Sequence, residues 1–454
     1  MNPSQTIFAL ASGGGRAGVA VIRVSGPGAG AALAGLMGVD GKSPKTLPRQ
    51  ALFTRLGDPA TGDVLDNGLV IWFPGPASFT GEDVAEFHVH GGAAVISGVL
   101  DALTRIDGLR MAEPGEFTRR AFENGKMDLT AAEGLADLIE AETEAQRKQA
   151  LRQLEGELGR IYESWRERLL SSLAHSEAAI DFSDEDLPQD IAAAAAREIA
   201  ALQREIAAHL KDKWRGERLR AGLMIAIIGP PNAGKSSLLN LLSQRDAAIV
   251  SETAGTTRDV IEVHLDLGGY PVTLADTAGL RDEGGDGDAI EAEGIRRARR
   301  KASDADLRLA VFDGEHWPAP DPATLCLVDA GTISVINKCD LGKLEPPLEI
   351  NGQPALAVSA LSGDGIDDLL SAIGARVAGM MDTGGSPALT RARHREALWE
   401  CRDALGRYLN GPDLSPELAA EDLRLAARAL GRITGRVDVD EILDVIFRDF
   451  CIGK

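Results

Sequence analysis

Residues 229–237 read Gly-Pro-Pro-Asn-Ala-Gly-Lys-Ser-Ser, and they directly follow the apolar run LMIAII at 223–228. This is the pattern G-x-x-x-x-G-K-[ST], placed between an expected buried strand and an expected helix over 237–242. Backbone N–H groups of such a loop wrap phosphates, and the helix N-terminus adds favourable partial charge. Lys235 is expected to reach the β- and γ-phosphates of a nucleotide, and the Ser236 hydroxyl to hold Mg²⁺. The stretch therefore predicts a nucleotide-binding domain.

Three further motifs follow this loop in the order found in GTP-binding domains. DTAG occupies 276–279 after an expected strand at 272–275, NKCD occupies 337–340 after an expected strand at 332–336, and SAL occupies 359–361. Asp276 is expected to hold the Mg²⁺ shell, and the Gly279 amide to sense the γ-phosphate. Chance turns would explain each short motif alone, but in this order the motifs predict a G domain.

The NKCD motif predicts which base is bound. The Asp340 carboxylate can accept hydrogen bonds from both the N1–H and the exocyclic amine of guanine, whereas adenine offers no matching pair of donors. The backbone of Ser359-Ala360-Leu361 is expected to contact guanine O6. The predicted substrate is therefore GTP and not ATP.

The hydrolytic machinery departs from that of Ras-like GTPases, in which a glutamine just after D-x-x-G orients the attacking water. Here that residue is Leu280, so another side chain must position the water. Asn232 can offer its amide oxygen to a monovalent cation, and residues 251–259 can supply backbone carbonyls to the same ion. A K⁺ there would add positive charge beside the β–γ bridge, as an arginine finger does. The residues alone leave open the alternative that Asn232 only caps the loop.

Composition indicates a globular protein with an excess of acids. The 454 residues suffice for about three domains, and no apolar run approaches the ~20 residues that cross a bilayer. The N-terminus shows no signal-peptide pattern, so a cytoplasmic protein without a membrane partner is expected. A net charge of −21 repels nucleic acid over most of the surface, so RNA must dock on a local basic patch or through a partner. Cys326, Cys339 and Cys401 form no C-x-x-C pair and are expected to be reduced structural thiols.

The pattern of the chain changes three times. Residues 1–122 alternate β-branched runs with Gly and Pro turns, and 123–221 carry apolar residues at helical spacing. Residues 222–378 alternate strands with helices, and 379–454 are helical again after a linker at 383–387. We expect the helices before 220 and after 388 to pack together, with the G domain inserted between them. Two separate helical domains are the alternative.

Four blocks outside the G domain resemble the MnmE (TrmE) family of tRNA-modification GTPases. They are GVAVIRVSG at 18–26, SFTGEDVAEFHVHGG at 78–92, PGEFTRRAF and NGKMDL within 114–129, and CIGK at 451–454. With the G motifs, the match spans essentially the full length and is far more specific than a P-loop. It implies an α/β + α fold with an N-terminal α/β folate-binding-like domain (1–122), a helical domain in two parts (123–221 and 379–454) and an inserted Ras-like P-loop G domain (222–378).

The resemblance also implies a folate site and an oligomeric state. The N-terminal domain would dimerise and bind 5-formyl- or 5,10-methylenetetrahydrofolate. By motif position Arg23, Glu86, Lys126 and Lys454 would contact the folate. The chemistry agrees, since a carboxylate accepts the N–H groups of a pterin and cations suit the glutamate tail of folate. The alternative, that Arg23 and Lys126 are ordinary surface charges, fits the motifs less well.

In the G domain the resemblance assigns metal ligands and the water-positioning group. Asn232, Ser251, Thr253 and Thr256 fall on the family's K⁺ ligands, and Ser236 and Thr257 on its Mg²⁺ ligands. Glu291 aligns with the glutamate that positions water, although the longer loop at 281–288 makes this depend on Gly294-Ile295 and predicts a mobile switch II. The residues predicted to bind GTP are Asn232, Ala233, Gly234, Lys235, Ser236, Ser237, Ser251, Glu252, Thr253, Ala254, Gly255, Thr256, Thr257, Asp276, Thr277, Ala278, Gly279, Asn337, Lys338, Asp340, Ser359, Ala360 and Leu361.

Cys451, in the C-terminal CIGK, completes the predicted catalytic set with Glu291 and Lys235. Family members carry a cysteine here, near the folate pocket. A thiol in a tail acts as a nucleophile only if its pKa is lowered. Packing of the tail is the competing explanation.

The resemblance implies a K⁺-dependent GTP hydrolase that works with the flavoprotein MnmG (GidA), in a complex with two copies of each. Together they would add an aminomethyl-type group, carboxymethylaminomethyl or aminomethyl, to carbon 5 of the wobble uridine of certain tRNAs. Folate would supply the carbon, glycine or ammonium the nitrogen, and the partner the FAD and NADH. GTP hydrolysis would drive a conformational cycle.

Two alternatives come from other functional classes. A ribosome-assembly GTPase shares Asn232 and a residue like Leu280, but usually carries a basic RNA-binding module, which the acidic composition and the CIGK tail disfavour. A folate-binding scaffold with a vestigial GTPase is disfavoured by the intact Lys235, Ser236, Asp276 and Asp340.

Overall fold

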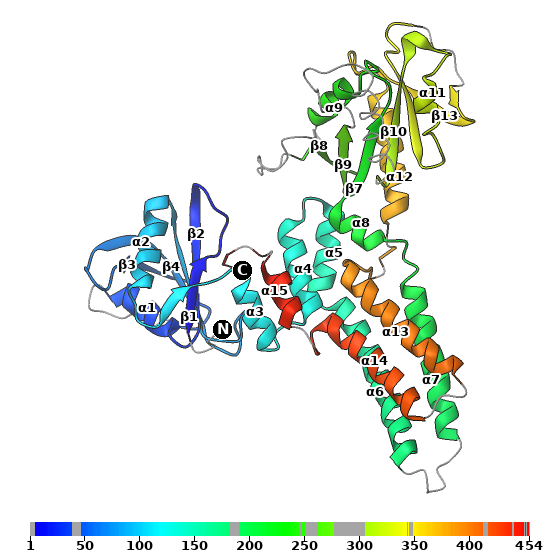
Figure 1. The fold of residues 1–454 in the computed structure, drawn as a ribbon. Coiled ribbons are helices and arrows are strands. Elements are labelled where there is room, and N and C mark those ends of the chain that lie inside the picture. The colour runs from blue at the N-terminus through cyan, green and yellow to red at the C-terminus, as the bar shows by residue number, and fades with distance from the viewer. Residues whose placement is uncertain are drawn as a thin grey trace, which may run out of the picture. The chain divides into compact units, whose positions relative to one another are not determined.

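The computed structural model describes residues 5–38, 47–181, 190–245, 247–249, 262–276, 305–342, 344, 348–382, 384–385, 387–411, 416–437, 440–448, 450 and 452–453. The chain, drawn as a ribbon in Figure 1, divides into two compact units. The first unit comprises Met1–Ala136, Gln153–Ala174 and Leu423–Lys454, and the second comprises Asp137–Arg152 and His175–Asp422.

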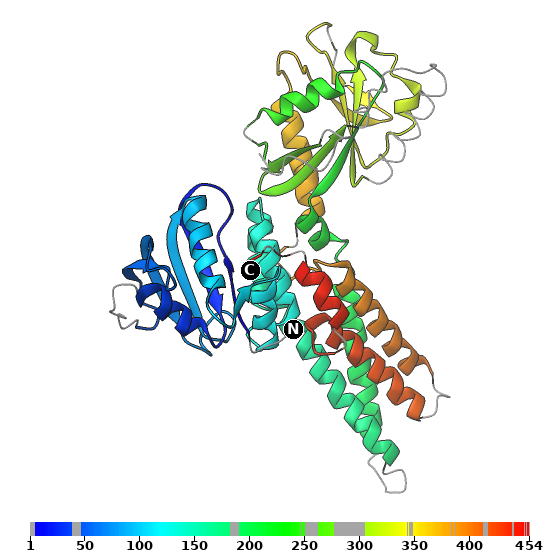
Figure 2. The same cartoon turned by 60° about the vertical axis from the view of Figure 1, so that its left-hand side comes forward.

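The first unit is built on a six-stranded sheet in the order β3-β4-β5-β2-β1-β6. Its strands are β1 (Thr6–Leu10), β2 (Ala17–Ser25), β3 (Leu52–Gly57), β4 (Val64–Phe73), β5 (Val84–Gly91) and β6 (Leu109–Met111). Neighbouring strands are antiparallel except β1 and β6. Helices α1 (Ala29–Met37) and α2 (Ala93–Thr104) cover one face (Figure 2). Ala20, Ile22 and Val24 alternate along β2 into this core, which leaves Arg23 on the other face.

The C-terminal helices of the first unit pack on the segment that follows the sheet. This segment contains α3 (Glu116–Glu123) and α4 (Leu129–Glu140), and α15 (Asp440–Arg448) contacts α3. Leu129, Leu443 and Phe447 share one buried cluster. Gly115 has a φ of +67°, and a Cβ there would lie 2.5 Å from the Phe447 carbonyl, so only glycine allows this approach. Two longer helices, α6 (Glu157–Asp181) and α14 (Pro416–Thr434), contribute to both units.

The second unit contains a seven-stranded sheet in the order β12-β13-β11-β10-β7-β9-β8. Its strands are β7 (Leu223–Ile228), β8 (Glu262–Leu267), β9 (Tyr270–Asp276), β10 (Leu307–Asp313), β11 (Thr332–Asn337), β12 (Glu349–Ile350) and β13 (Gln353–Ala357). The five inner strands are parallel, and β8 and β12 are antiparallel edges. Its helices are α9 (Lys235–Ser243), α11 (Pro322–Leu325) and α12 (Ile366–Met381), with a 3₁₀ turn at Gly314–His316. The strands expected at 223–228, 272–275 and 332–336 are confirmed.

The other helices of the second unit come from the chain segments before and after the G motifs. They are α5 (Glu144–Leu154), α7 (Asp190–His209), α8 (Arg215–Ala221) and α13 (Ala392–Asn410). Helices α7 and α13 lie side by side (Figure 1), and the Gln203 amide donates to the Arg402 carbonyl at 3.4 Å. The expected packing of helices from before 220 and after 388 is confirmed here. The Ala-rich stretch 190–219 is not one helix, because a turn at 210–214 divides it into α7 and α8.

Within the described part of the chain, no helix has the length and apolar character that crossing a membrane requires.

Candidate nucleotide and folate sites

The loop between β7 and α9 has the backbone of a phosphate-binding loop. Gly229 and Gly234 have φ values of +155° and +91°. A Cβ at Gly229 would lie 2.3 Å from the Val311 carbonyl, and one at Gly234 would lie 2.2 Å from Nδ2 of Asn337. Both positions therefore require glycine, which fixes the path of the loop at the start of α9.

The two predicted phosphate and metal ligands begin α9. Lys235 is buried, and its ammonium donates to the carbonyls of Gly229 (2.9 Å) and Pro230 (2.8 Å). These contacts hold the positive charge inside the loop. Ser236 and Ser237 follow on the exposed first turn of α9. The N–H groups of the first turn of an α-helix have no acceptor within the helix and can donate to anionic oxygens.

Asn337 links the loop to the base-recognition segment. Its Nδ2 donates to the Ala233 carbonyl at 2.8 Å, and its Oδ1 accepts from the Ala360 amide at 3.0 Å. Asn337 itself is buried. The sequence predicts Asn337 as a GTP ligand, and the structure gives it a bridging position between two of the predicted contact segments.

Lys338 and Asp340 lie on either side of Cys339. The Lys338 ammonium pairs with Asp313 at 2.7 Å, and this hydrogen bond raises the pKa of Lys338. The Ser359 hydroxyl donates to Oδ1 of Asp340 at 2.5 Å and accepts from the Ser362 amide at 3.0 Å. Ser359 therefore orients the carboxylate that is predicted to read guanine, while Leu361 is 87% exposed beside it.

Asp276 ends β9 at the same edge of the sheet. It stands opposite Ile227 in the β7–β9 ladder, two residues before Gly229. The carboxyl ends of parallel strands thus bring the backbone of Asp276, the first residue of DTAG, to the phosphate loop. Several predicted residues lie outside the described part of the chain, as do Leu280 and the switch II expectation. They are Ser251, Glu252, Thr253, Ala254, Gly255, Thr256, Thr257, Thr277, Ala278, Gly279, Glu291, Cys451 and Lys454.

The predicted folate residues Arg23 and Glu86 are paired on the face of the six-stranded sheet opposite α1 and α2, where Phe117 of α3 packs on β1. They stand opposite each other in the β2–β5 ladder, and Nε and Nη2 of Arg23 both lie 3.0 Å from Oε1 of Glu86. Both side chains are largely buried, with 21% and 15% exposed. The Arg23 guanidinium also lies 5.4 Å from the ring centre of Phe79 and 5.8 Å from that of Phe117.

His88 is a neighbour of this pair that the predicted set omits. Its Nε2 lies 3.2 Å from Oε2 of Glu86. Residues two apart on a strand share a face, so the sequence E-F-H at 86–88 predicts that His88 lies on the same face as Glu86.

Lys126 and the C-terminal tail approach the same region by separate routes. The Lys126 ammonium donates to the Pro76 carbonyl at 2.9 Å, in the loop that also carries Phe79. In the tail, Ile452 forms a bridge with Pro114, and a Cβ on Gly453 would lie 2.0 Å from the Leu10 carbonyl. Leu10 pairs with Ile22, the neighbour of Arg23. The described part of the tail therefore meets the end of β1, the strand that pairs with the one carrying Arg23.

Comparison with known proteins shows which family the whole chain matches. A family model for the GTP-binding protein TrmE N-terminus matches residues 6–126, and a model for the MnmE helical domain matches residues 129–451. The tRNA modification GTPase MnmE of Paramagnetospirillum magneticum is 58% identical over 451 residues, which cover 99% of this chain and 100% of that protein. The chain belongs to the MnmE family of tRNA modification GTPases.

Other MnmE relatives extend beyond bacteria. MnmE of Parvibaculum lavamentivorans is 57% identical over 99% of this chain and 100% of its own length. The human mitochondrial protein named 5-taurinomethyluridine-[tRNA] synthase subunit GTPB3 is 51% identical over 99% of this chain and 93% of its length. Among solved structures, the G domain of the FeoB iron transporter of T. maritima matches at 25% identity over 34% of this chain and 98% of its own, with a TM-score of 0.26. A score this low does not bear on the fold.

Membership of the MnmE family fixes the class of activity. The chain is a GTP hydrolase that acts in tRNA modification. The full-length match favours neither of the alternatives considered from sequence, an assembly factor for ribosomes or a scaffold with a vestigial GTPase. The fold is the expected one, with an N-terminal α/β domain, helical segments and an inserted P-loop domain.

Proposed function

We propose that the chain is a K⁺-dependent GTPase that works with the flavoprotein MnmG (GidA) on the wobble uridine of certain tRNAs. The pair adds a carboxymethylaminomethyl or aminomethyl group to carbon 5, with a folate one-carbon unit as the source of carbon. The observation that carries this proposal is the Glu86 carboxylate. It is largely buried, held by Arg23 and next to His88 on a sheet face that no helix of the first unit's α1–α2 layer covers.

The residues around Glu86 fit a tetrahydrofolate derivative. Both oxygens of the Glu86 carboxylate already have a partner, Arg23 or His88. The carboxylate can still accept the N–H groups of a pterin, because each carboxylate oxygen has two lone pairs. Phe79 lies beside Arg23, and an aromatic side chain there can pack against a flat pterin ring. Arg23, Lys126 and Lys454 would meet the anionic tail of the cofactor, which supplies the one-carbon unit when bound.

In the G domain, the residues of the phosphate loop bind the phosphates of GTP. Lys235 exchanges its two loop carbonyls for β- and γ-phosphate oxygens, which neutralises charge that develops on the γ-phosphate. Asp340, oriented by Ser359, accepts from guanine. Glu291 holds the attacking water, because Leu280 has no group that can do so.

The donor set also fits the two expected metal ions. Within the described residues the side chain of Asn232 makes no hydrogen bond, although Asn232 is held at a φ of +64° at the top of the loop. An amide that caps nothing there is free to ligate K⁺ with Ser251, Thr253 and Thr256, and K⁺ supplies positive charge beside the β–γ bridge. The Ser236 hydroxyl suits Mg²⁺ with Thr257 and Asp276.

A homodimer is supported by exposed apolar side chains on the face of the six-stranded sheet opposite α1 and α2. Phe53 and Leu69 stand opposite each other in the β3–β4 ladder and are 69% and 41% exposed, and Val19 on β2 is 57% exposed. Burying these side chains against a second copy removes apolar surface from water. The same face carries Arg23 and Glu86, so the dimer would form next to the folate site.

The remaining chemistry belongs to the partner and the cell. MnmG, with two copies for two of this chain, brings the FAD and NADH, and glycine or ammonium supplies the nitrogen. GTP hydrolysis drives conformational change and not the carbon chemistry, since the predicted folate and nucleotide residues lie in different units of the chain.

The test is nucleoside mass spectrometry of tRNA from cells in which this gene is deleted and then restored. We expect the 5-aminomethyl-type uridine to disappear and return. Restoration with Glu86→Gln tests the folate role, because the amide keeps the size of the side chain and loses its charge. A nucleoside profile that is unchanged by deletion would overturn the proposal and would favour a function in ribosome assembly.

A further inference from the structure

The turn that separates α7 from α8 is held in place by one buried arginine. Arg395, on α13, is 2% exposed. Its guanidinium donates to Oδ1 of Asp212 at 2.7 Å, to both oxygens of Glu217 at 2.8 and 2.9 Å, and to the Leu210 carbonyl at 3.1 Å. These charge-assisted bonds fix the turn from both ends.

The turn holds a tryptophan in an unfavourable backbone conformation. Lys213 and Trp214 have φ values of +57° and +62°, which cost of order 1–3 kcal/mol each for residues other than glycine. The Trp214 amide donates to Oδ1 of Asp212 at 3.1 Å, and its ring lies 4.0 Å from the Arg395 guanidinium. The Arg395 contacts therefore offset the strain and keep Trp214 where it is.

The result is a pair of displayed indole rings. Trp214 is 45% exposed, and Trp399 on α13 is 39% exposed. Their ring centres are 6.3 Å apart with an angle of 74° between the planes, an edge-to-face arrangement. Large aromatic side chains that stay exposed on a rigid, strained turn indicate a contact surface.

Positive charge gathers on the same turn. Lys211 and Lys213 are exposed and Arg215 is half-buried, and none of the three makes an ion pair with a described residue. The nearest acids in sequence, Asp212 and Glu217, are engaged by Arg395. Glu396 and Glu400, on either side of Trp399 in the sequence of α13, are exposed and negative. The excess of positive charge is therefore confined to the turn. In a chain of net charge −21, such a patch suits a polyanion.

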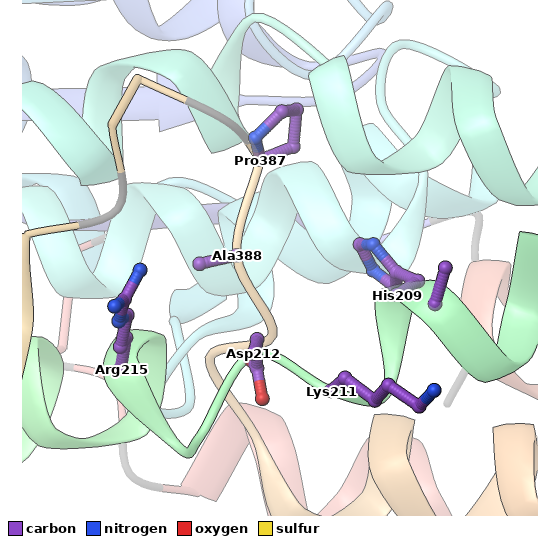
Figure 3. A pocket seen from close by; sticks show the side chains of 7 residues that line it. His209, Lys211, Asp212, Arg215, Pro387 and Ala388 are labelled. Atoms are coloured by element: carbon purple, nitrogen blue, oxygen red, sulfur yellow. The ribbon is translucent and has the colours of Figure 1, made fainter.

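A cavity of about 320 Å³ adjoins these cations, lined by His209, Lys211, Asp212, Arg215, Pro387 and Ala388. Figure 3 shows His209 and Arg215 on either side of Ala388, with Asp212 between them. Oδ2 of Asp212 is buried and has no hydrogen-bond partner among the described residues. A buried acceptor of this kind needs a donor, and the amine or ring N–H of a nucleobase is one.

We propose that this turn is a tRNA-binding surface, in which Trp214 stacks on an unpaired base and Lys211, Lys213 and Arg215 contact neighbouring phosphates. Asp212 accepts from the edge of a base that enters the cavity. An exposed aromatic ring, cations that form no ion pair with a described residue, and a hydrogen-bond acceptor together are the parts that bind single-stranded RNA. The inference rests on the proposed tRNA function and adds the surface that holds the RNA.

The test is fluorescence anisotropy of labelled, unmodified tRNA titrated with the full-length chain. Trp214→Ala is expected to weaken binding about tenfold, and Trp214→Phe by much less because a smaller ring still stacks. Lys211→Ala with Lys213→Ala is expected to reduce the slope of log affinity against log salt by about two. Lys148→Ala, which removes an exposed lysine from α5, should change neither quantity.

Each variant is checked by its thermal unfolding and by its GTP hydrolysis rate, both of which should match wild type. Wild type that binds no tRNA, or variants that bind tRNA as tightly as wild type with the same salt slope, would overturn the surface. Variants that lose affinity for the flavoprotein but not for tRNA would assign it to a protein partner instead. Nucleoside mass spectrometry separates these results from a failure of the modification function, because it reads the product whatever surface holds the tRNA.

Discussion

The side-chain amide of Asn337 donates a 2.8 Å hydrogen bond to the backbone carbonyl of Ala233. One residue at the end of β11 thus holds the phosphate loop, and its Oδ1 holds the Ala360 amide at the same time. The phosphate loop and the base-recognition segment are therefore fixed relative to each other before they meet a nucleotide. Loss of this bridge should affect both parts of the site.

Asn337→Asp should weaken GTP binding at least tenfold. The change replaces the donor to Ala233 with a carboxylate oxygen in a buried position, and an unmatched buried group costs about 1–3 kcal/mol. The affinity is measured with a fluorescent GTP analogue. Asn240→Asp, on the exposed surface of α9, is the matched control and should bind normally. Wild-type affinity in Asn337→Asp would contradict the bridging role.

Asp340→Asn should shift the preference of the site from guanine to xanthine nucleotides. The amide offers a donor to the xanthine 2-oxo group, where the carboxylate offers an acceptor to the guanine amine. Competition between GTP and XTP for the same site measures the change. Ser359→Ala, which removes the 2.5 Å hydrogen bond to Asp340, should weaken GTP without favouring XTP. Unchanged GTP selectivity in Asp340→Asn would refute base reading by this residue.

Acid should destabilise the first unit through Glu116. Burial alone would raise the pKa of this carboxyl, but hydrogen bonds from Arg110, the Glu113 amide and Arg120 hold its pKa below the usual value. Its stabilising contribution is therefore complete above the usual carboxyl pKa, near 4.5, and is lost as pH falls through the lowered value.

Glu116→Gln should lower the free energy of unfolding by about 2 kcal/mol at pH 7, and the difference from wild type should shrink toward pH 3. The midpoint of urea unfolding, followed by circular dichroism, measures both. Glu123→Gln alters an exposed pair with Arg119 and should have little effect. A difference that stays constant with pH would argue against a charged Glu116.

Cys401 should resist alkylation in the folded protein. Burial raises the pKa of its thiol to about 12, so at pH 8 only roughly one molecule in ten thousand carries the thiolate. Peptide mass spectrometry after iodoacetamide treatment should show Cys326, which is exposed, modified before Cys401. Cys401 should react only in denaturant, and equal rates in the native protein would show that α13 opens.

Local patterns predicted the G domain well because they act over short distances. The run at 223–228 is long enough for one buried strand, and the glycines at 229 and 234 end it in a loop whose φ values only glycine adopts readily. The register that pairs Arg23 with Glu86 is different. It joins strands far apart in the chain, so the sequence named both residues through family motifs but could not place them in contact.

The break between α7 and α8 has no mark in the local sequence. The stretch 190–219 is rich in alanine and arginine, which favour helix, and Lys213-Trp214 offers no glycine or proline to mark a turn. The turn depends on Arg395, a residue of α13 that reaches it only in the folded chain. Tertiary contacts here override helix propensity, and local sequence does not reveal them.

Replacing K⁺ with Na⁺ at equal ionic strength should slow GTP hydrolysis sharply if Asn232 ligates the ion. Asn232→Gly is the sharpest variant, because glycine keeps the φ of +64° without strain and removes only the side chain. It should bind GTP within a few-fold of wild type and lose its response to K⁺. Asn240→Gly would disturb α9, so Asn240→Ala is the better control and should keep the K⁺ response. If K⁺ still accelerates the Asn232→Gly variant, Asn232 is not needed to hold the ion. If wild type hydrolyses GTP at equal rates in Na⁺ and K⁺, no K⁺ acts in the site at all.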